Sequence, residues 1–415
     1  MRDTNMQAIL GYVVILGIAY LLAERKSHTP WRTISMGIVL HLGLALLLLK
    51  IPFIRSFFLL LNEVVRALQE ATLSGTSLIF GYLGGSPIPF DVKLGSSTFI
   101  LAFQALPLVL LVSALSALLY HWRILPLVVS GFAWCLQRIL GVGGTAGVST
   151  AANIFVGMVE APLLVKPYLE KASKSDFFII MTSGMATIAG TVMLLYATFL
   201  NGIIPDPLGN LIIASILNAP AAIILVRLIV PPKPSEISEH TDLGQIYDSP
   251  MDALTRGTAD GMSLLLNITG MVIVVVALVS LINMVLGLIP FQTSPLTLQS
   301  ILGLFMAPLA WLIGIPWAEA KIAGEILGTK VALNEFLAYL SMSQLQTPLL
   351  SDSSRLILTY ALCGFANFQG LAIMLAGLSA MVPNRRKDIL GLGLKSILAG
   401  FLSSCLTACL VGFII

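Results

Sequence analysis

The sequence predicts an all-α integral membrane protein, and three observations lead to this fold class. First, 57% of the 415 residues are hydrophobic and only 10% are charged, against about 45–50% and about 25% in globular proteins. Second, uncharged apolar runs long enough to cross a bilayer recur along the chain. Third, two other apolar segments are interrupted by polar residues, glycine and proline. We therefore expect eight transmembrane helices, two re-entrant hairpins and interfacial helices.

The predicted spans are the charge-free runs, because a charge at the centre of a membrane helix is costly. A helix needs about 20 mostly apolar residues to cross the hydrocarbon core. The run 261–318 is too long for one crossing, so we expect it to hold a span, a turn near 290–295 and the start of another embedded segment. In chain order, the predicted spans are residues 6–23, 33–49, 94–120, 177–205, 207–226, the first part of 261–318, 356–384 and 396–415.

Residues 54–71 differ from the spans because charged and apolar side chains alternate there at roughly helical spacing. Arg55, Glu63, Arg66 and Glu70 are interspersed with leucine, valine and phenylalanine. This pattern is typical of an amphipathic helix that lies along the membrane interface.

The distribution of Lys and Arg between the connections predicts the orientation of the chain. The odd-numbered connections carry basic residues, such as Arg385 and Arg386 in the seventh, whereas 201–210 and 290–299 carry none. Because basic loops stay on the cytoplasmic side, we expect both termini to lie outside. The net charge is only +3 and no basic stretch is interleaved with aromatic residues, so no nucleic-acid partner is expected.

Two apolar segments, 141–168 and 317–339, contain too many glycine, proline or charged residues to be ordinary spans. Non-helical backbone at membrane depth is tolerated only where it is buried in protein or lines a wet cavity, so both are predicted to be re-entrant hairpins. A span with several polar residues follows each hairpin. This arrangement, present once in each half, is typical of a secondary transporter with two repeats and a midplane binding site. The polar residues expected to be functional there are Asn153, Glu160, Asn334, Glu335 and Asn367.

Residues 151–168 closely resemble the first hairpin of the concentrative nucleoside transporter family. Other motifs resemble further parts of this family in the same order, so the resemblance covers essentially the whole chain. These motifs are residues 74–81, 184–190, 314–320, 334–336 and 363–367. The resemblance implies a homotrimer of elevator-type transporters, in which a transport part slides against a scaffold. It also implies that the protein imports nucleosides across the cytoplasmic (inner) membrane.

On the basis of this resemblance, we expect the chain to divide into four parts. Residues 1–120 would form scaffold helices 1–3, with an interfacial helix at about 54–71, and residues 121–230 the first transport repeat, with an interfacial helix, hairpin 1 at about 143–169 and helices 4–5. Residues 231–300 would form a cytoplasmic loop and scaffold helix 6. Residues 301–415 would form the second transport repeat, with hairpin 2 at about 305–340 and helices 7–8.

The resemblance assigns the coupling ion to four groups beside the first hairpin. They are the Asn153 side chain, the Val156 carbonyl, the Thr187 hydroxyl and the Ile188 carbonyl. Sodium is a hard cation that prefers oxygen ligands, and unwound backbone supplies carbonyls without bringing a charge into the membrane. Because the asparagine is retained, we expect sodium as the coupling ion, with proton coupling as the alternative. No other cofactor is expected.

The resemblance places the nucleoside between the first hairpin and the second half of the chain. Glu335 and Asn367 match the ribose-binding positions, where a carboxylate and an amide can bind adjacent hydroxyl groups. Phe365 and Val192 match the apolar walls around the base, and Glu160 matches the acid of the first hairpin.

Two departures from the family pattern concern the substrate. Met158 and Val159 replace a Gln-Thr pair before the hairpin acid, and Gly370 replaces a serine that commonly assists the sugar. Methionine and valine cannot read the hydrogen-bonding edge of a base, which reduces discrimination, and methionine adapts to different ring systems. We therefore expect weak selection for uracil, with broad or purine-biased acceptance of nucleosides. A related ribosylated compound is the alternative substrate.

The sequence disfavours two other classes of protein. A membrane enzyme needs a nucleophile, an acid–base pair or a metal cluster facing a cavity, but the chain has no His-Glu-x-x-His or Gly-x-Ser-x-Gly motif and no clustered histidines. Its four cysteines lack metal-ligand spacing. A receptor would need a soluble output module, for which the loops are too short, and a channel would not accumulate its substrate. We therefore expect a transporter and not an enzyme.

Overall fold

The structure is a computed structural model of the chain. It describes residues 2–91, 98–232, 247–288, 296–345 and 349–415. Within these ranges, all regular secondary structure is helical. The start of the third predicted span, most of the hydrophilic loop 231–250 and the predicted turn at 290–295 lie outside the described residues.

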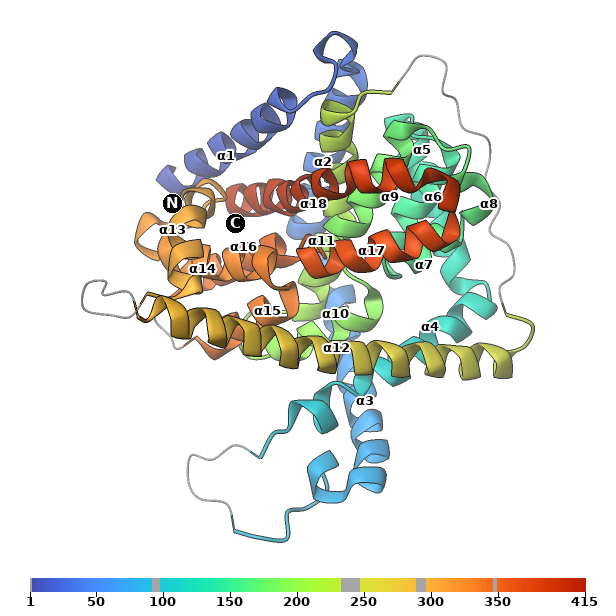
Figure 1. Cartoon of the computed structure of the whole chain (residues 1–415), viewed down its shortest axis with the longest axis vertical. Helices are drawn as coiled ribbons and strands as arrows, with labels where there is room; N and C mark the ends of the chain where they lie inside the picture. The colour runs from blue at the N-terminus through green and yellow to red at the C-terminus, as the bar shows by residue number, and fades with distance from the viewer. Residues whose placement is uncertain (1, 92–97, 233–246, 289–295, 346–348) are drawn as a thin grey trace.

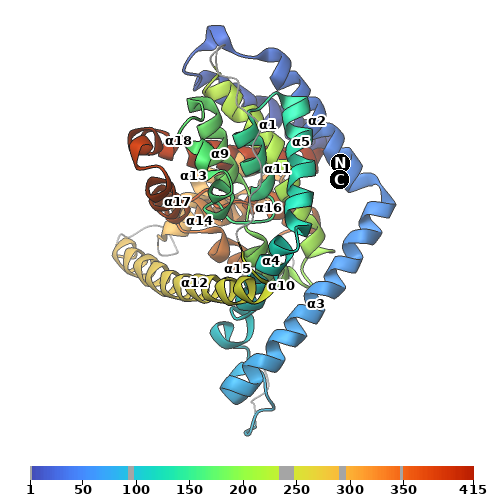
Figure 2. The same cartoon turned by 90° about the vertical axis from the view of Figure 1, so that its right-hand side faces the viewer.

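The N-terminal part of the chain contributes three long helices, of which α3 extends beyond the main body (Figure 2). α3 begins at Pro52, where proline is favourable because a first-turn N–H has no partner within the helix. It continues to Phe80, so it is longer than the predicted interfacial helix 54–71. The elements are α1 (Arg2–Leu21), η1 (Lys26–His28), α2 (Trp31–Lys50), α3 (Pro52–Phe80), η2 (Gly81–Gly84) and the π-helical turn η3 (Leu101–Ala105).

Two successive sets of helices follow, and both have the same order. Each set has two helices, a hairpin, a broken helix and a long final helix. The first set is α4 (Leu108–His121), α5 (Ile124–Leu140), α6 (Gly144–Asn153), α7 (Glu160–Leu163), α8 (Lys166–Leu169), α9 (Lys174–Ala186), α10 (Gly190–Leu200) and α11 (Pro207–Ile229). The second set is α12 (Pro250–Leu286), α13 (Leu298–Leu312), α14 (Trp317–Ala332), α15 (Glu335–Gln344), α16 (Asp352–Leu362), α17 (Phe368–Met381), η4 (Pro383–Arg385) and α18 (Arg386–Ile414).

The second hairpin differs in extent from the range 305–340 given by the sequence. α13 is a separate helix, bent by 119° relative to α14. The hairpin itself consists of α14 and α15, which meet at Leu333 and Asn334 and pack against each other. The segment 317–339, recognised by its polar and charged residues, begins where α14 begins, whereas the wider range 305–340 also included the end of α13.

Among the described residues, six helical segments are long and apolar enough to cross a membrane, and the bent pair α13–α14 would be a seventh. Two other predicted spans correspond to shorter helices. The first lies in α1, and the seventh is divided by a break into α16 and α17. The protein is therefore an all-helical, multi-pass membrane protein, while the number of eight crossings stays a prediction.

Burial divides the long helices into central and peripheral ones. In α11 and α18, 89% of the most apolar 18-residue stretch is buried inside the protein, whereas in α12 the share is 6%. α12 lies at the outside in both views (Figure 1, Figure 2) and packs along α4. At Gly257 and Gly261, added Cβ atoms would lie 2.8 and 2.9 Å from the Cβ atoms of Ala117 and Ser113. Glycine therefore allows this close pairing, while many other apolar side chains of α12, such as Met262, Ile273 and Leu281, are exposed on the outside of the single chain.

Candidate functional site

The break between α9 and α10 lies against the break between α16 and α17. The backbone N–H of Phe365 donates to the carbonyl of Thr187 at 3.3 Å. Gly364 has φ of 131°, and an added Cβ would lie 2.7 Å from the carbonyl oxygen of Ala186. This position favours glycine, because other residues rarely adopt this backbone conformation and a side chain would prevent the contact.

Asn218, on α11, binds both breaks with a single amide group. Its Nδ2 atom donates to the carbonyl of Ala186 at 2.7 Å and to the carbonyl of Cys363 at 3.1 Å. The last carbonyls of a helix have no partner within the helix, and a buried carbonyl needs a donor. This one side chain therefore provides a hydrogen-bond donor to a buried carbonyl at a helix end in each half of the protein.

The tip of the first hairpin, residues 154–159, packs on the break between α9 and α10. The N–H of Gly190 donates to the carbonyl of Phe155 at 3.0 Å. Beside this contact, Asn153 Nδ2 donates to Ser183 Oγ at 3.2 Å, and Thr187 Oγ1 donates to the Ser183 carbonyl at 2.9 Å. Two of the four predicted ion ligands therefore converge on the same residue of α9.

The other two predicted ligands, Val156 and Ile188, lie in the hairpin tip and in the helix break respectively. The best indication of a cation is the Asn153 Oδ1 atom, which is buried and accepts no hydrogen bond. A buried polar atom without a partner is costly, and a cation would satisfy it. The residues present, an amide oxygen with a hydroxyl and carbonyls nearby, therefore fit an oxygen-coordinated cation.

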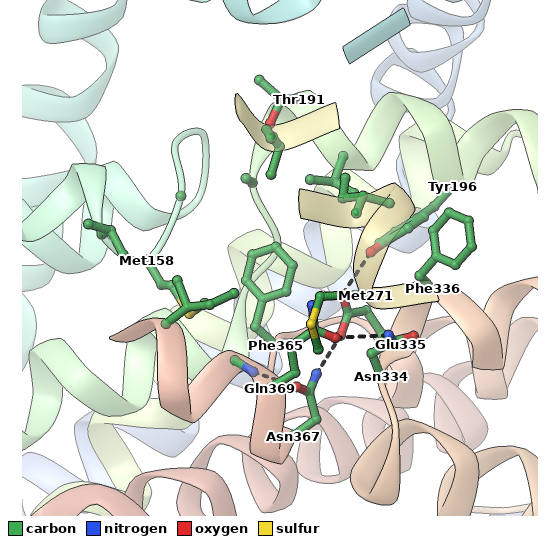
Figure 3. Close-up of a pocket in the computed structure, with 18 of the residues that line it drawn as sticks. Met158, Thr191, Tyr196, Met271, Asn334, Glu335, Phe336, Phe365, Asn367 and Gln369 are labelled. Atoms are coloured by element: carbon green, nitrogen blue, oxygen red, sulfur yellow. Dashed lines mark hydrogen bonds between the residues drawn. The ribbon is translucent and has the colours of Figure 1, made fainter. Parts of the chain in front are cut away.

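Glu335 is the first residue of α15, and only 4% of its surface is exposed. The Tyr196 hydroxyl donates to its Oε1 atom at 2.7 Å, and Asn367 Nδ2 donates to its Oε2 atom at 2.6 Å (Figure 3). Asn367 also caps α17, because its Oδ1 atom accepts from the N–H of Gly370 at 2.6 Å. The N-terminal ends of α15 and α17 therefore lie beside this carboxylate, and their partial positive charge stabilises an anionic group.

One cavity of about 140 Å³ lies between the two hairpin tips, the two breaks and α12. All eight residues that the sequence assigned to the substrate line this cavity. They are Met158, Val159, Glu160, Val192, Glu335, Phe365, Asn367 and Gly370. Figure 3 shows the Phe365 ring between Met158 on one side and the Glu335–Asn367 pair on the other. The cavity thus has an apolar part and a hydrogen-bonding part.

The two departures in the first hairpin place apolar side chains against neighbouring glycines. A Cβ added to Gly184 of α9 would lie 2.9 Å from the Met158 Cβ, so the backbone of the tip is seated closely on α9. A Cβ added to Gly377 of α17 would lie 2.8 Å from Val159 Cγ1. Met158 is buried and Val159 half-buried at the cavity wall, so the apolar part of the cavity is fixed by packing on both sides.

Gly370 also has a steric explanation. A Cβ added there would collide with the carbonyl oxygen of Phe365, so the backbone occupies the place that a serine side chain would need. A polar side chain is present one residue earlier. Gln369 Oε1 accepts a hydrogen bond from Asn334 Nδ2 at 3.0 Å, and both residues line the cavity. This pair links the tip of the second hairpin to α17.

Glu160 lies at the boundary between this cavity and a second one of about 420 Å³. Its side chain is exposed to these cavities and folds back over Gly157, so that its carboxylate occupies the space beside the glycine Cα. The second cavity is also lined by Tyr247 and by Arg256 and Asp260 of α12. Glu160 is therefore at the entrance to the substrate cavity, whereas Glu335 is at its buried end.

Several lining residues were not assigned to the site from the sequence, and Tyr196, Gln369 and Met271 are the informative examples. The hydroxyl of Tyr196 stands in an apolar run, where a buried tyrosine needs a hydrogen-bond partner, and this signal was available. Gln369 could have been found as a polar residue of an interrupted span. Met271, on α12, gives no signal, because an apolar side chain is ordinary in a membrane helix.

An all-helical membrane bundle with a polar cavity at two crossed helix breaks is a transport protein by its architecture. Profiles of the Na+ dependent nucleoside transporter match this chain at residues 10–83 (N-terminus) and 210–412 (C-terminus), and a nucleoside recognition profile matches residues 102–202. The chain belongs to the concentrative nucleoside transporter family, which confirms the resemblance inferred from its motifs. Its relatives are transporters and not enzymes.

Individual relatives are similar over the full length of the chain. Uncharacterized transporter YutK of Bacillus subtilis is 38% identical over 98% of each chain. Nucleoside permease NupC of Helicobacter pylori is 35% identical over 99% of this chain and 98% of its own. Human sodium/nucleoside cotransporter 1 is 30% identical over all of this chain and 64% of its own.

Solved structures of the transporter CNTnw have the same fold. CNTnw in an inward-facing substrate-bound state matches with a TM-score of 0.89 and 34% identity, over 99% of this chain and 97% of that one. A doubly substituted CNTnw in an outward-facing state matches with a TM-score of 0.92 and 33% identity, over 100% and 98%.

Proposed function

We propose that this protein is a symporter that imports nucleosides across the cytoplasmic (inner) membrane and is driven by a sodium gradient. The observation that carries the proposal is the contact between the two helix breaks, through Phe365 and Thr187. The predicted ion ligands lie in and beside the first break, and the predicted substrate ligands lie beside both breaks, with the proposed sugar ligands at the second. An ion and a substrate bound there would therefore stabilise the same local structure, as a symporter requires.

The sugar would bind at the buried end of the cavity, at Glu335 and Asn367. A carboxylate accepts hydrogen bonds from two adjacent hydroxyl groups, and an amide can donate and accept in the same plane. The two side chains now bind each other at 2.6 Å, so an incoming hydroxyl would have to compete with an existing charge-assisted bond. A ribose, with two neighbouring hydroxyls, can replace it with two bonds.

The base would lie between Phe365, Val192 and the first hairpin. Met158 and Val159 offer this base no side-chain hydrogen bond, so we propose weak selection for uracil and broad or purine-biased acceptance of nucleosides. Transport of another ribosylated compound is the alternative, since the sugar contacts would be the same.

Sodium is proposed as the coupling ion because the Asn153 Oδ1 atom is buried without a partner and the ligands around it are neutral oxygens. Relatives of this chain are named sodium/nucleoside cotransporters, which supports the same ion. Proton coupling is the alternative. It would require a titrating group that changes its charge during transport, and Glu160, which faces both cavities, would be the candidate.

The mechanism would be an elevator movement within a homotrimer, with both termini outside. Related CNTnw structures are described as inward-facing, intermediate and outward-facing, which supports alternating access. Only 6% of the apolar stretch of α12 is buried in the single chain, which supports a scaffold position in contact with lipid or with neighbouring protomers. The breaks and hairpins would then move together as the transport part.

Uptake of labelled nucleosides into proteoliposomes tests the proposal. The purified protein would be reconstituted with an inward sodium gradient, with a proton gradient, or with neither, and offered a panel of purine and pyrimidine nucleosides. We expect accumulation above the external concentration only with the sodium gradient, and its loss when a sodium ionophore collapses that gradient.

Two results would contradict the proposal in different ways. Accumulation driven only by the proton gradient would establish the alternative coupling ion. Equilibration without accumulation under every gradient would indicate a channel. The variant Glu335→Gln, reconstituted in parallel, shows how much uptake occurs independently of the proposed sugar site.

A further inference from the structure

Lys330 of α14 is a fully buried lysine that the proposed mechanism does not use. Its exposed fraction is 0%. The ammonium donates to the carbonyl of Ala361 at 2.7 Å and to Ser404 Oγ of α18 at 2.9 Å. It also lies 5.4 Å from the centre of the Phe401 ring. Its hydrogen-bond partners are thus neutral oxygens, as they would be for a bound alkali cation.

A buried charge is costly unless its surroundings compensate it, so this position must offer a negative potential. Ala361 is in the last turn of α16, where carbonyls have no partner within the helix and carry the negative end of the helix dipole. The aromatic face of Phe401 adds a further attraction for a cation. The carboxyl end of α16 is therefore a cation site, and the lysine side chain fills it.

The corresponding place in the first half of the protein is the carboxyl end of α9, which has the same position in the order of elements. There, the hairpin contributes a neutral amide, Asn153, whose Oδ1 atom has no partner. We propose that Lys330 is a covalently tethered cation that takes, in the second half, the place which the mobile coupling ion takes in the first. Lys330 thereby holds the second break and Glu335 in the substrate-binding arrangement without a second ion.

Two contacts explain how Lys330 would act on the substrate site. Ala361 lies two residues before Cys363, where the break that carries Phe365 and Asn367 begins. Lys330 also lies five residues before Glu335 on the same hairpin and attracts its carboxylate electrostatically. It is thus a positioning residue, which touches neither cavity. The inference rests on the proposed function only for the identity of the mobile ion.

Binding of a labelled nucleoside to the purified protein, titrated with sodium at constant ionic strength, tests this inference. Lys330→Met keeps most of the length and removes the charge, so we expect about tenfold weaker nucleoside binding, which corresponds to about 1.4 kcal/mol. Lys321→Met is the matched control, because Lys321 is an exposed lysine on the same helix, and we expect its binding to be unchanged. Lys330→Arg, which keeps the charge, should bind better than Lys330→Met.

The sodium dependence separates a tethered cation from a merely structural lysine. Lys330→Asn supplies an oxygen and leaves space, so sodium should fill the vacated place and the titration should become steeper than hyperbolic. The wild-type titration should be hyperbolic, as for one ion. A cooperative wild-type titration with two sodium ions would overturn the inference even if no variant folds. The inference would also be overturned if Lys330→Met bound the nucleoside with wild-type affinity. The same holds if a folded Lys330→Asn lost nucleoside affinity while the shape of its sodium titration stayed unchanged.

A failure of the proposed function gives a different result. If sodium has no effect on the wild-type protein, the assigned coupling ion is wrong. The comparison of Lys330→Met, Lys330→Arg and Lys321→Met then still measures whether a positive charge at Lys330 is needed for nucleoside binding. Equal binding by all three would overturn the inference in that case as well.

Discussion

The two halves of the protein use the same order of helices but different chemistry at the hairpin tips. The first half brings a neutral amide with an unpartnered oxygen, Asn153, to the end of a half helix. The second half brings an ammonium, Lys330, to the equivalent helix end and a carboxylate, Glu335, to the cavity. In the proposed mechanism, the same architecture holds a cation reversibly in the first half and permanently in the second. The half with the permanent cation is then the one proposed to bind the sugar.

Removing the carboxylate of the second half should have the largest effect. Glu335→Gln keeps the shape but replaces charge-assisted hydrogen bonds by neutral ones, which are about half as strong. Weakening two such contacts, worth about 1.5–3 kcal/mol each, to about half their strength costs about 1.5–3 kcal/mol in total, which should reduce nucleoside uptake roughly 10- to 100-fold. Initial rates in proteoliposomes measure this.

Glu325→Gln is the control for that substitution, because Glu325 lies on the same hairpin but outside the cavity. It should transport normally. Near-normal uptake by Glu335→Gln would show that the second half does not bind the sugar through its carboxylate, and the contrast between the halves would then fail.

Removing the amide of the first half should have the next largest effect, and on the ion alone. Asn153→Ala deletes one oxygen ligand, so the sodium concentration for half-maximal uptake should rise about tenfold, as for a loss of about 1.4 kcal/mol. The maximal rate at saturating sodium should change less. Val148→Ala, on the same buried helix, is the control, because its side chain carries no oxygen. An unaltered sodium requirement in Asn153→Ala would place the ion elsewhere.

Tyr196 connects the two halves, because it lies on α10 and its hydroxyl donates a hydrogen bond to the Glu335 carboxylate on α15 at 2.7 Å. Tyr196→Phe removes this one donor, and we expect about a fivefold rise in the nucleoside KM, since part of the 1.5–3 kcal/mol of such a bond is recovered by rearrangement. Tyr339→Phe is the control, because that hydroxyl binds the carbonyl of Thr359 instead. Equal effects of both substitutions would indicate lost packing and not a lost contact to Glu335.

The smallest effect should be on the choice of base. The double variant Met158→Gln, Val159→Thr gives the first hairpin hydrogen-bonding groups, and we expect it to raise the preference for uridine over adenosine about threefold or more. Competition between the two labelled nucleosides measures this ratio. A strong uridine preference in the wild-type protein that persists in Met158→Ala would show that the hairpin does not read the base.

The sequence predicted the helical membrane fold well because charge-free runs report directly on bilayer crossing. It did not predict the extents of α3 and of the second hairpin. Residues 54–71 showed an amphipathic pattern, but helix α3 continues to Phe80 because nothing in the following polar residues stops it. The predicted hairpin 317–339 begins where α14 begins, but the wider range 305–340 included part of α13, because the run 261–318 has no charge to mark the end of that helix.

The eight substrate residues given by the sequence line one cavity, because they lie on hairpin tips and helix breaks that glycine and asparagine mark in the sequence. The roles of Tyr196 and Lys330 could not be predicted. The contact of Tyr196 joins residues 139 positions apart, and that of Lys330 with Ser404 joins residues 74 positions apart. Such pairings depend on the tertiary fold and not on local spacing.

The amide of Asn218 would link the two proposed binding events thermodynamically. Because one Nδ2 atom bonds to the last carbonyls of both half helices, any displacement of one helix end changes the geometry of the other. Linkage is reciprocal, so the factor by which sodium tightens nucleoside binding must equal the factor by which the nucleoside tightens sodium binding. The strictness of coupling would then be set at Asn218, a residue that binds neither the ion nor the nucleoside.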